Sequence, residues 1–420
     1  MSASPRQRSL AALSLLCFAL ADVRDGLGPF FGVYLQGHGW TPDAIGYVMT
    51  LGGLTGVFAA APAGALADAT RHTRFWLAVI VCGIVLACAG IFVWPRPLMA
   101  GLSQIGQGLL AAAVAPLISG LSLGLVGQGG LPARLGRNEA WNHAGNAASA
   151  VLGGLVGWWY GGIGGVLLVM SGMGVLSLLA VRGIREQDID HAAARGLESK
   201  HDSSARANVP PPSRLAFLFS DKALLCAGGI VLFFHLGNAA MLPLLGQSAV
   251  ARFAVDPAVY TACTVILAQA TMIPVAVWTA WLAPRRGYGV PLLCALLALP
   301  LRGCIAGYWQ SPWSIIPVQI LDGVGAGVLG VVTPGVVALL LRGSGHINLG
   351  LGMVMTLQGI GAAFSASWGG VVAHYLGYHM AFLALAVAPC IALALLLLGL
   401  RRLPRLREAL RRCPAGEELA

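Results

Sequence analysis

Long apolar stretches alternate with short polar segments along almost the whole chain. A helix needs about 20 mainly apolar residues to cross a hydrocarbon core about 30 Å thick, and in lipid its backbone amides must bond within the segment. The apolar stretches reach that length, so the pattern predicts helical membrane spans. We place twelve of them, at residues 9–36, 43–68, 75–94, 98–126, 138–160, 163–182, 223–247, 257–283, 288–309, 312–341, 348–373 and 377–400.

The distribution of lysine and arginine predicts the orientation of these spans. The two ends of the chain and the connections that follow even-numbered spans are basic, whereas the opposite connections contain only Arg96 and Arg252. Positive residues are enriched on the cytoplasmic side of membrane proteins. We therefore expect both termini in the cytoplasm, and a multi-pass protein of the bacterial inner membrane.

One polar connection, residues 183–222, is much longer than the others and contains three consecutive prolines. It divides the chain into a six-helix bundle at 1–182 and another at 223–400, with a cytoplasmic linker between them. An arginine-rich tail, 401–420, follows and predicts a cytoplasmic helix that faces anionic lipid.

The two predicted bundles repeat one another in the placement of prolines. Pro29 and Pro243 lie inside the first span of each half, and Pro116 and Pro334 follow glycine-rich stretches in the fourth. Internal repeats of this kind are typical of transporters. The predicted fold is therefore an all-α membrane protein of twelve transmembrane helices in two pseudo-symmetric six-helix bundles.

Composition excludes several other classes of protein. The chain is 57% hydrophobic and 10% charged, with a mean hydropathy of +0.78, whereas soluble domains carry roughly a quarter charged residues. The net charge of +10 lies in short connections rather than on a basic face, so we expect no nucleic-acid partner. The sequence has no phosphate-binding loop, no metal-ligand spacing of cysteines and no catalytic constellation. We expect no cofactor, no metal and no enzymatic activity.

Ionisable residues inside the first span are the first candidates for function, because a charge in a membrane is retained only where it faces a cavity or a partner. Asp22 and Asp25 share a helix face, and Arg24 points about 160° away from them. We expect Arg24 to pair with another helix and one aspartate to exchange a proton. The alternative is a fixed charge network that ties helices together.

The fifth span opens with polar residues on one face. Glu139 and His143 are four residues apart, so they can hydrogen-bond and titrate together as a proton relay or gate. Polar contacts between helices are the alternative. Their order differs from that of zinc peptidases, which argues against a metal site. We interpret Asn138, at the start of this span, as a helix cap.

The C-terminal half has two charges within its spans, Arg302 and Asp322. Each can be the other's partner, or Asp322 can face a cavity as a second proton or cation site. His235 and Asn238 lie three residues apart in the seventh span, on one helix face, as groups that orient a substrate would.

The segment GALADATRHTR at 64–74 resembles the G-x-L-A-D-R-x-G-R-R/K loop of the major facilitator superfamily. Its counterpart, LAPRRG at 282–287, keeps the arginines but has proline in place of the acid. The resemblance covers essentially the whole chain and implies a cytoplasmic gate, in which Asp68 pairs and the basic residues hold the halves together. The gate residues are then Gly64, Asp68, Arg71, Arg74, Arg285 and Arg286.

The resemblance also implies that spans 1, 4, 7 and 10 line a central cavity. Gln104 stands where the drug/proton antiporter branch of this family has an arginine, so the sequence departs from that branch. The substrate-cavity candidates are Arg24, Gln104, Gln107, His235, Asn238 and Arg302. The proton-coupling candidates are Asp22, Asp25, Glu139, His143 and Asp322.

Together these features predict a secondary active transporter that moves a small solute by alternating access, with proton-coupled export as the leading hypothesis. A proton-coupled importer of a nutrient or an iron chelate is the alternative within transport. An integral-membrane enzyme or a receptor is the alternative from another class. The expected partners are the solute, protons and the lipid bilayer, and we expect a monomer.

Overall fold

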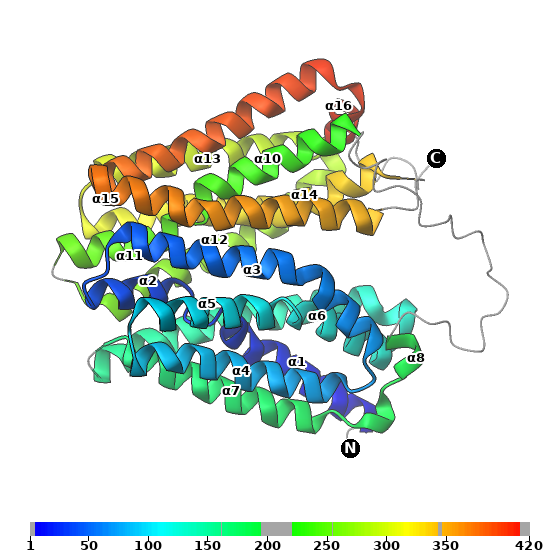
Figure 1. Ribbon diagram of the computed structural model, residues 1–420. Helices are drawn as coiled ribbons and strands as arrows, with labels where there is room; N and C mark the ends of the chain where they lie inside the picture. Colours follow the sequence, from blue (N-terminus) through cyan, green and yellow to red (C-terminus); the bar gives the residue numbers. More distant parts are fainter. Residues whose placement is uncertain (1–4, 161, 195–220, 254, 343–346, 412–420) are drawn as a thin grey trace. The chain divides into compact units, whose positions relative to one another are not determined.

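The computed structural model describes residues 5–160, 162–194, 221–253, 255–342 and 347–411 (Figure 1). Helices form most of these ranges, and no strand occurs within them. Each of the twelve apolar stretches lies almost entirely in helix. The predicted all-α fold is thus confirmed for the described part of the chain.

The first half of the chain forms seven longer helices and two short ones. Their bounds are α1 Pro5–Asp25, α2 Gly28–Gly37, α3 Pro42–Ala69, α4 Thr73–Val93, α5 Pro97–Ala111, α6 Val114–Tyr160, α7 Gly164–Gly183, η1 Glu186–Asp188 and α8 His191–Ala194. The second half contains α10 Lys222–Asn238, α11 Met241–Arg252, α12 Pro257–Arg286, α13 Gly289–Tyr308, η2 Pro312–Ser314, α14 Ile315–Leu340, α15 Ile347–Arg402 and α16 Pro404–Arg411.

Glycines with positive φ break the longest helical runs. Gly127 (φ 71°) divides α6, and Gly377 (φ 82°) divides α15. Residues other than glycine rarely adopt this left-handed region, so the helix cannot pass straight through it. Both breaks coincide with predicted ends, since Gly127 follows the stretch 98–126 and Gly377 opens the stretch 377–400.

Nine helical segments of the described chain are long and apolar enough to cross a membrane. Among them are 42–69, 73–93 and 164–183 in the first half and 257–286 and 312–340 in the second. The chain is therefore a multi-pass membrane protein. The number twelve and the cytoplasmic side of the termini stay predictions.

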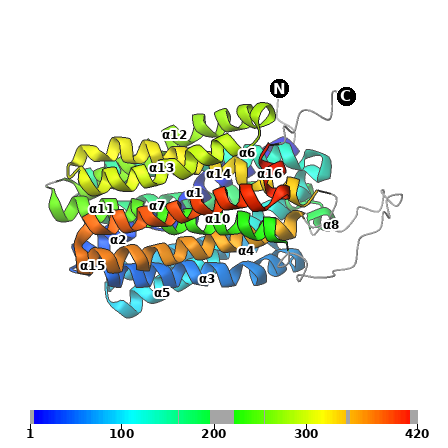
Figure 2. The ribbon, with the colours of Figure 1, turned by 90° about the horizontal axis from the view of Figure 1, so that it is seen from above.

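Backbone contacts group the chain into two compact units. Of the described residues, unit 1 contains those within 5–38, 51–194 and 256–263, and unit 2 those within 39–50, 221–255 and 264–411. In unit 1, α1 packs against α6 and α7, and α4 against α5 and α7. In unit 2, α10 lies along α15 (Figure 2), and α13 packs against both α14 and α15. The predicted division at a linker of residues 183–222 stays a prediction.

Candidate functional site

Three predicted residues, Arg24, Asp25 and Gln107, lie close together at the break between α1 and α2 in unit 1. Arg24 Nε lies 3.5 Å from Asp25 Oδ1, and the two side chains are 42% and 52% exposed. The expectation that Arg24 pairs with another helix is therefore wrong. The 160° separation assumes an ideal helix, but α1 ends at Asp25, and the flexible guanidinium reaches its neighbour there.

Two glutamines of α5 hold this break in place. Gln107 Nε2 donates to the Asp25 backbone oxygen (2.8 Å), and Gln104 Nε2 donates to Gln107 Oε1 (3.2 Å). Gly26 (φ 60°) makes the approach possible, because a Cβ there would lie 2.8 Å from the Gln107 amide. Gln107, itself held by Gln104, thus satisfies one of the carbonyl groups that the end of α1 leaves without a helical partner.

A cavity of about 280 Å³ lies beside this break, between α1 and the two parts of α6. The volume is near the lower end for small-molecule sites. Its lining combines apolar side chains with Arg24, Glu139 and three uncharged polar residues. In full it comprises Cys17, Leu20, Arg24, Val114, Ala115, Ile118, Ser119, Leu135, Asn138, Glu139 and Asn142. Opposite charges in a largely apolar cavity suit a small polar solute.

The predicted hydrogen bond between Glu139 and His143 is not formed. Glu139 Oε2 instead accepts from Asn142 Nδ2 (3.3 Å), one turn along the same helix. His143 Nδ1 is buried without a hydrogen-bond partner among the described residues, and so is Asp22 Oδ2. Of these three candidates for proton coupling, Glu139 lines the cavity, whereas His143 and Asp22 each bury an atom without a hydrogen-bond partner.

A buried network that the sequence analysis missed supports the same cavity. Arg134 Nε donates to Asn138 Oδ1 (2.8 Å), Arg134 Nη2 to Ser14 Oγ (2.9 Å), and Asn138 Nδ2 to Ser122 Oγ (2.8 Å). Asn138 lies inside α6, so its interpretation as a helix cap is wrong. Burial lowers the pKa of the Arg134 guanidinium, because desolvation disfavours its charged form. The i,i+4 spacing of Arg134 and Asn138 was the available signal.

In unit 2, a fully buried arginine joins three helices. Arg302 of α13 is 0% exposed, and its Nη1 lies 3.0 Å from Asp322 Oδ1 of α14 and donates to Asn238 Oδ1 of α10. His235 Nδ1 lies 2.9 Å from the Val231 oxygen of its own helix. Of the two alternatives for Asp322, the structure has the ion pair. An isolated buried charge is too costly to persist, which explains why the two residues pair.

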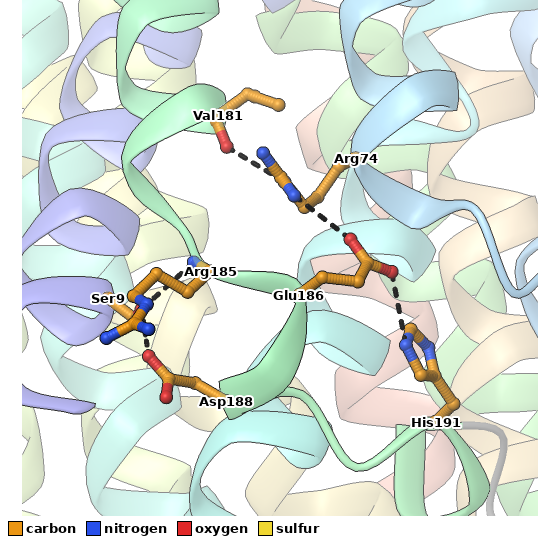
Figure 3. A network of polar contacts seen from close by, with 7 residues as sticks. All are labelled: Ser9, Arg74, Val181, Arg185, Glu186, Asp188 and His191. Atoms are coloured by element: carbon orange, nitrogen blue, oxygen red, sulfur yellow. Dashed lines mark hydrogen bonds and ion pairs between the residues drawn. The ribbon is translucent and has the colours of Figure 1, made fainter. Parts of the chain in front are cut away.

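One predicted gate residue of unit 1, Arg74, belongs to a polar network with the residues that follow α7 (Figure 3). Arg74 Nη1 lies 3.0 Å from Glu186 Oε2 and its Nε donates to the Val181 oxygen, while His191 Nε2 lies 3.1 Å from Glu186 Oε1. Ser9 Oγ donates to Asp188 Oδ2 (2.6 Å) and accepts from the Arg185 amide. The start of the predicted linker is thus anchored to α1 through Ser9 and to α4 through Arg74.

The other gate residues make fewer contacts. Gly64 and Asp68 lie in α3, and Arg71 follows it; no ion pair between described residues involves Asp68. Arg285 lies over the ring of Trp281 (4.0 Å), and Arg286 is exposed. Pairing at the gate through Asp68 stays a prediction.

Comparison with known proteins identifies the relatives of this chain. The model of the Major Facilitator Superfamily matches residues 12–301. Two proteins of Mycobacterium tuberculosis, described as uncharacterized MFS-type transporters of strains CDC 1551 and H37Rv, are each 38% identical over 384 residues, 90% of this chain and 90% of theirs.

Solved structures share the fold at low identity. A variant of the nucleoside transporter NupG has a TM-score of 0.72 at 17% identity, covering 94% of this chain and 99% of that one. A bacterial homolog of the human lysosomal transporter Spinster, inward-facing and unoccupied, has a TM-score of 0.75 at 13% identity, covering 99% and 100%.

Proposed function

Because this chain belongs to the major facilitator superfamily and is a multi-pass membrane transporter, we propose that it moves a small solute across the bacterial inner membrane by alternating access. We further propose that protons drive the cycle and that the direction is export. The observation that carries the proposal is the set of ionisable side chains held within apolar helices: Asp22, Arg24 and Asp25 beside the cavity of unit 1, and Arg302 with Asp322 in unit 2.

The proposed coupling step in unit 1 is protonation of Asp25. A proton on this carboxylate removes the charge that holds the Arg24 guanidinium at 3.5 Å. Arg24 also lines the cavity, so the released guanidinium can turn toward a solute bound there. Binding of proton and solute would then be linked, as secondary transport requires.

Unit 2 contains a second pair of an arginine and an aspartate, and this pair is more deeply buried. Asp322 is the counter-charge of Arg302, and Asn238 shares the guanidinium. Protonation of Asp322 leaves a buried cation with one neutral partner, which favours rearrangement of α10, α13 and α14. We propose that this pair couples protonation of Asp322 to the change of state, and that the ion pair forms again when the proton leaves.

The test needs a transported solute, and a thermal-shift screen of the purified protein against diverse solutes would supply one. Flux of that solute is then measured in proteoliposomes under an imposed pH gradient. Asp25→Asn should still bind the solute but lose pH-driven flux. Asp256→Asn is the matched control, because the same change at the start of α12 keeps an oxygen for the Val259 amide. Unchanged flux in Asp25→Asn would remove Asp25 from the coupling role.

The same assay decides direction. Solute movement against the proton flow indicates an antiporter and supports export. Movement with the proton flow supports the alternative, an importer of a nutrient or an iron chelate. Flux that ignores the pH gradient but follows a sodium gradient would overturn proton coupling while leaving transport intact.

A further inference from the structure

A short amphipathic helix, α16, packs across one end of unit 2, against α10, α14 and α15 (Figure 1). Its inward side is buried in the core of the unit through Leu406, Ala409 and Leu410. On one flank, Arg405 Nη1 lies 2.9 Å from Asp221 Oδ2, and its Nη2 donates to the Leu340 oxygen (2.8 Å). These contacts fix the rotation of α16 and determine which side its other arginines face.

The opposite flank of α16 carries Arg407 and Arg411, one helical turn apart and both exposed. This flank meets the end of α12 at Gly287. The glycine has φ 74°, and a Cβ there would overlap the Leu410 carbonyl oxygen and lie 3.1 Å from the Arg411 Cα. The close approach brings Arg411 beside Arg286, although the two are more than a hundred residues apart in sequence.

Arg286 and Arg411 therefore meet beside Gly287, and Arg285 and Arg407 are the neighbouring exposed arginines on the same two helices; we call these four residues the α12–α16 patch. Within the described residues, no ion pair involves any of the four. The acid on this helix, Glu408, projects from the side of α16 between Arg405 and Arg411. Even with Glu408 counted against it, the patch keeps a net positive charge, because four arginines face one acid.

Tryptophans mark the depth of this patch. Arg285 lies 4.0 Å above the ring of Trp281 and donates to the Trp281 oxygen (3.3 Å). Trp281 is 55% exposed and Trp278 40% exposed, on the helix with the smallest buried share among the nine candidate spans. Exposed tryptophans at the ends of spans lie at the level of lipid head groups.

From this juxtaposition we propose that the α12–α16 patch binds the head group of an anionic phospholipid. Guanidinium groups match phosphate oxygens with two parallel hydrogen bonds, which the ammonium of lysine does not offer. The stacked Arg285 and Trp281 form a platform beside the acyl chains, while Arg286, Arg407 and Arg411 face the phosphodiester. Basic pockets between helices at membrane surfaces are known to bind such lipids. The site is independent of the transported solute.

The test measures lipid binding to the purified full-length protein in neutral detergent by native mass spectrometry, with phosphatidylglycerol or cardiolipin titrated against phosphatidylcholine. The variant is Arg407→Gln with Arg411→Gln. The matched control is Arg8→Gln with Arg137→Gln, which removes the same charge from exposed arginines of unit 1. Circular dichroism and size exclusion verify that both variants are folded.

We expect the anionic lipids to bind the wild type more tightly than phosphatidylcholine. The patch variant should bind them about tenfold more weakly, whereas the control should lie within twofold of the wild type. Single variants Arg407→Gln and Arg411→Gln should each lose part of the affinity. Equal losses in patch and control variants would reduce the effect to net charge and overturn the site. Equal affinity for anionic and zwitterionic lipid would also overturn it, as would full competition by inorganic phosphate at the same concentration.

Discussion

Removing Asp322 should destabilise unit 2 far more than removing Asp322 and Arg302 together. Arg302 is 0% exposed and its Nη1 is held by Asp322 and Asn238, so Asp322→Ala leaves a buried guanidinium with one neutral partner. Breaking a buried ion pair in this way costs about 3–5 kcal/mol. Replacing both residues with apolar side chains, as in Arg302→Met with Asp322→Leu, should cost less than about 2 kcal/mol, because no uncompensated charge remains.

The assay is equilibrium unfolding in detergent micelles, followed by loss of helical circular dichroism, for the wild type, Arg302→Met, Asp322→Leu and the double variant, with Asp322→Ala measured beside them. The four free energies of unfolding form a cycle, and we expect a coupling energy of at least about 2 kcal/mol between the two positions. A cost below about 1 kcal/mol for Asp322→Ala would refute the reasoning. So would a double variant as unstable as the sum of the single variants, because the charges would then act separately.

Two further predictions concern packing in unit 2. Asp221 accepts from the amides that open α10 and is paired with Arg405, so Asp221→Ala should lower the free energy of unfolding by about 2 kcal/mol. Asp221→Asn keeps an oxygen for the amides and should therefore cost less. Equal losses in the two variants would contradict the capping role. Gly361→Ala should lower the free energy of unfolding by about 1–3 kcal/mol, because its Cβ would overlap the Leu232 oxygen of α10. Gly352→Ala on the same helix has open space around it, so it should be neutral or stabilising by up to about 1 kcal/mol. Thermal unfolding compares the two variants.

The helical part of the fold could be predicted from sequence because the bilayer imposes one simple rule. Segments in lipid must be helical and apolar, so the stretches that satisfy length and hydropathy coincide with helices. The interruptions at Gly127 and Gly377 were also within reach, since each glycine lies at the edge of an apolar stretch. The family that the loop at 64–74 resembles was confirmed by the family model, which matches residues 12–301.

The partners of the charged residues were harder to predict from the sequence. Arg302 and Asp322 were recognised as a possible pair because few charges share the apolar half in which they lie. Arg24 was misassigned because an ideal pitch was applied to a residue in the last turn of a helix. The hydrogen bond expected between Glu139 and His143 is not formed, because a helix offers two neighbours at similar distance and spacing alone does not rank Asn142 against His143; their role as a relay or gate stays a prediction.

No local sequence pattern predicts the contacts between segments that lie far apart in the chain. The arginine patch depends on the glycine between α12 and α13 that admits the backbone of α16, and no pattern within either segment predicts that approach. The network of Arg134 with Ser14 and Ser122 likewise joins residues of low individual interest. Such contacts depend on packing and need coordinates.

Because α1 ends at Asp25, the negative end of its helix dipole lies inside unit 1. The peptide dipoles of α1 add up to about half a negative charge at this terminus, where the chain also places Asp22 and Asp25. Arg24 supplies the single formal positive charge that the last turn of α1 contributes against them. While Asp22 and Asp25 are both ionised, the balance there is negative, so an ammonium or guanidinium group on a visiting molecule would be attracted and a carboxylate or phosphate repelled; protonation of Asp25 weakens this preference.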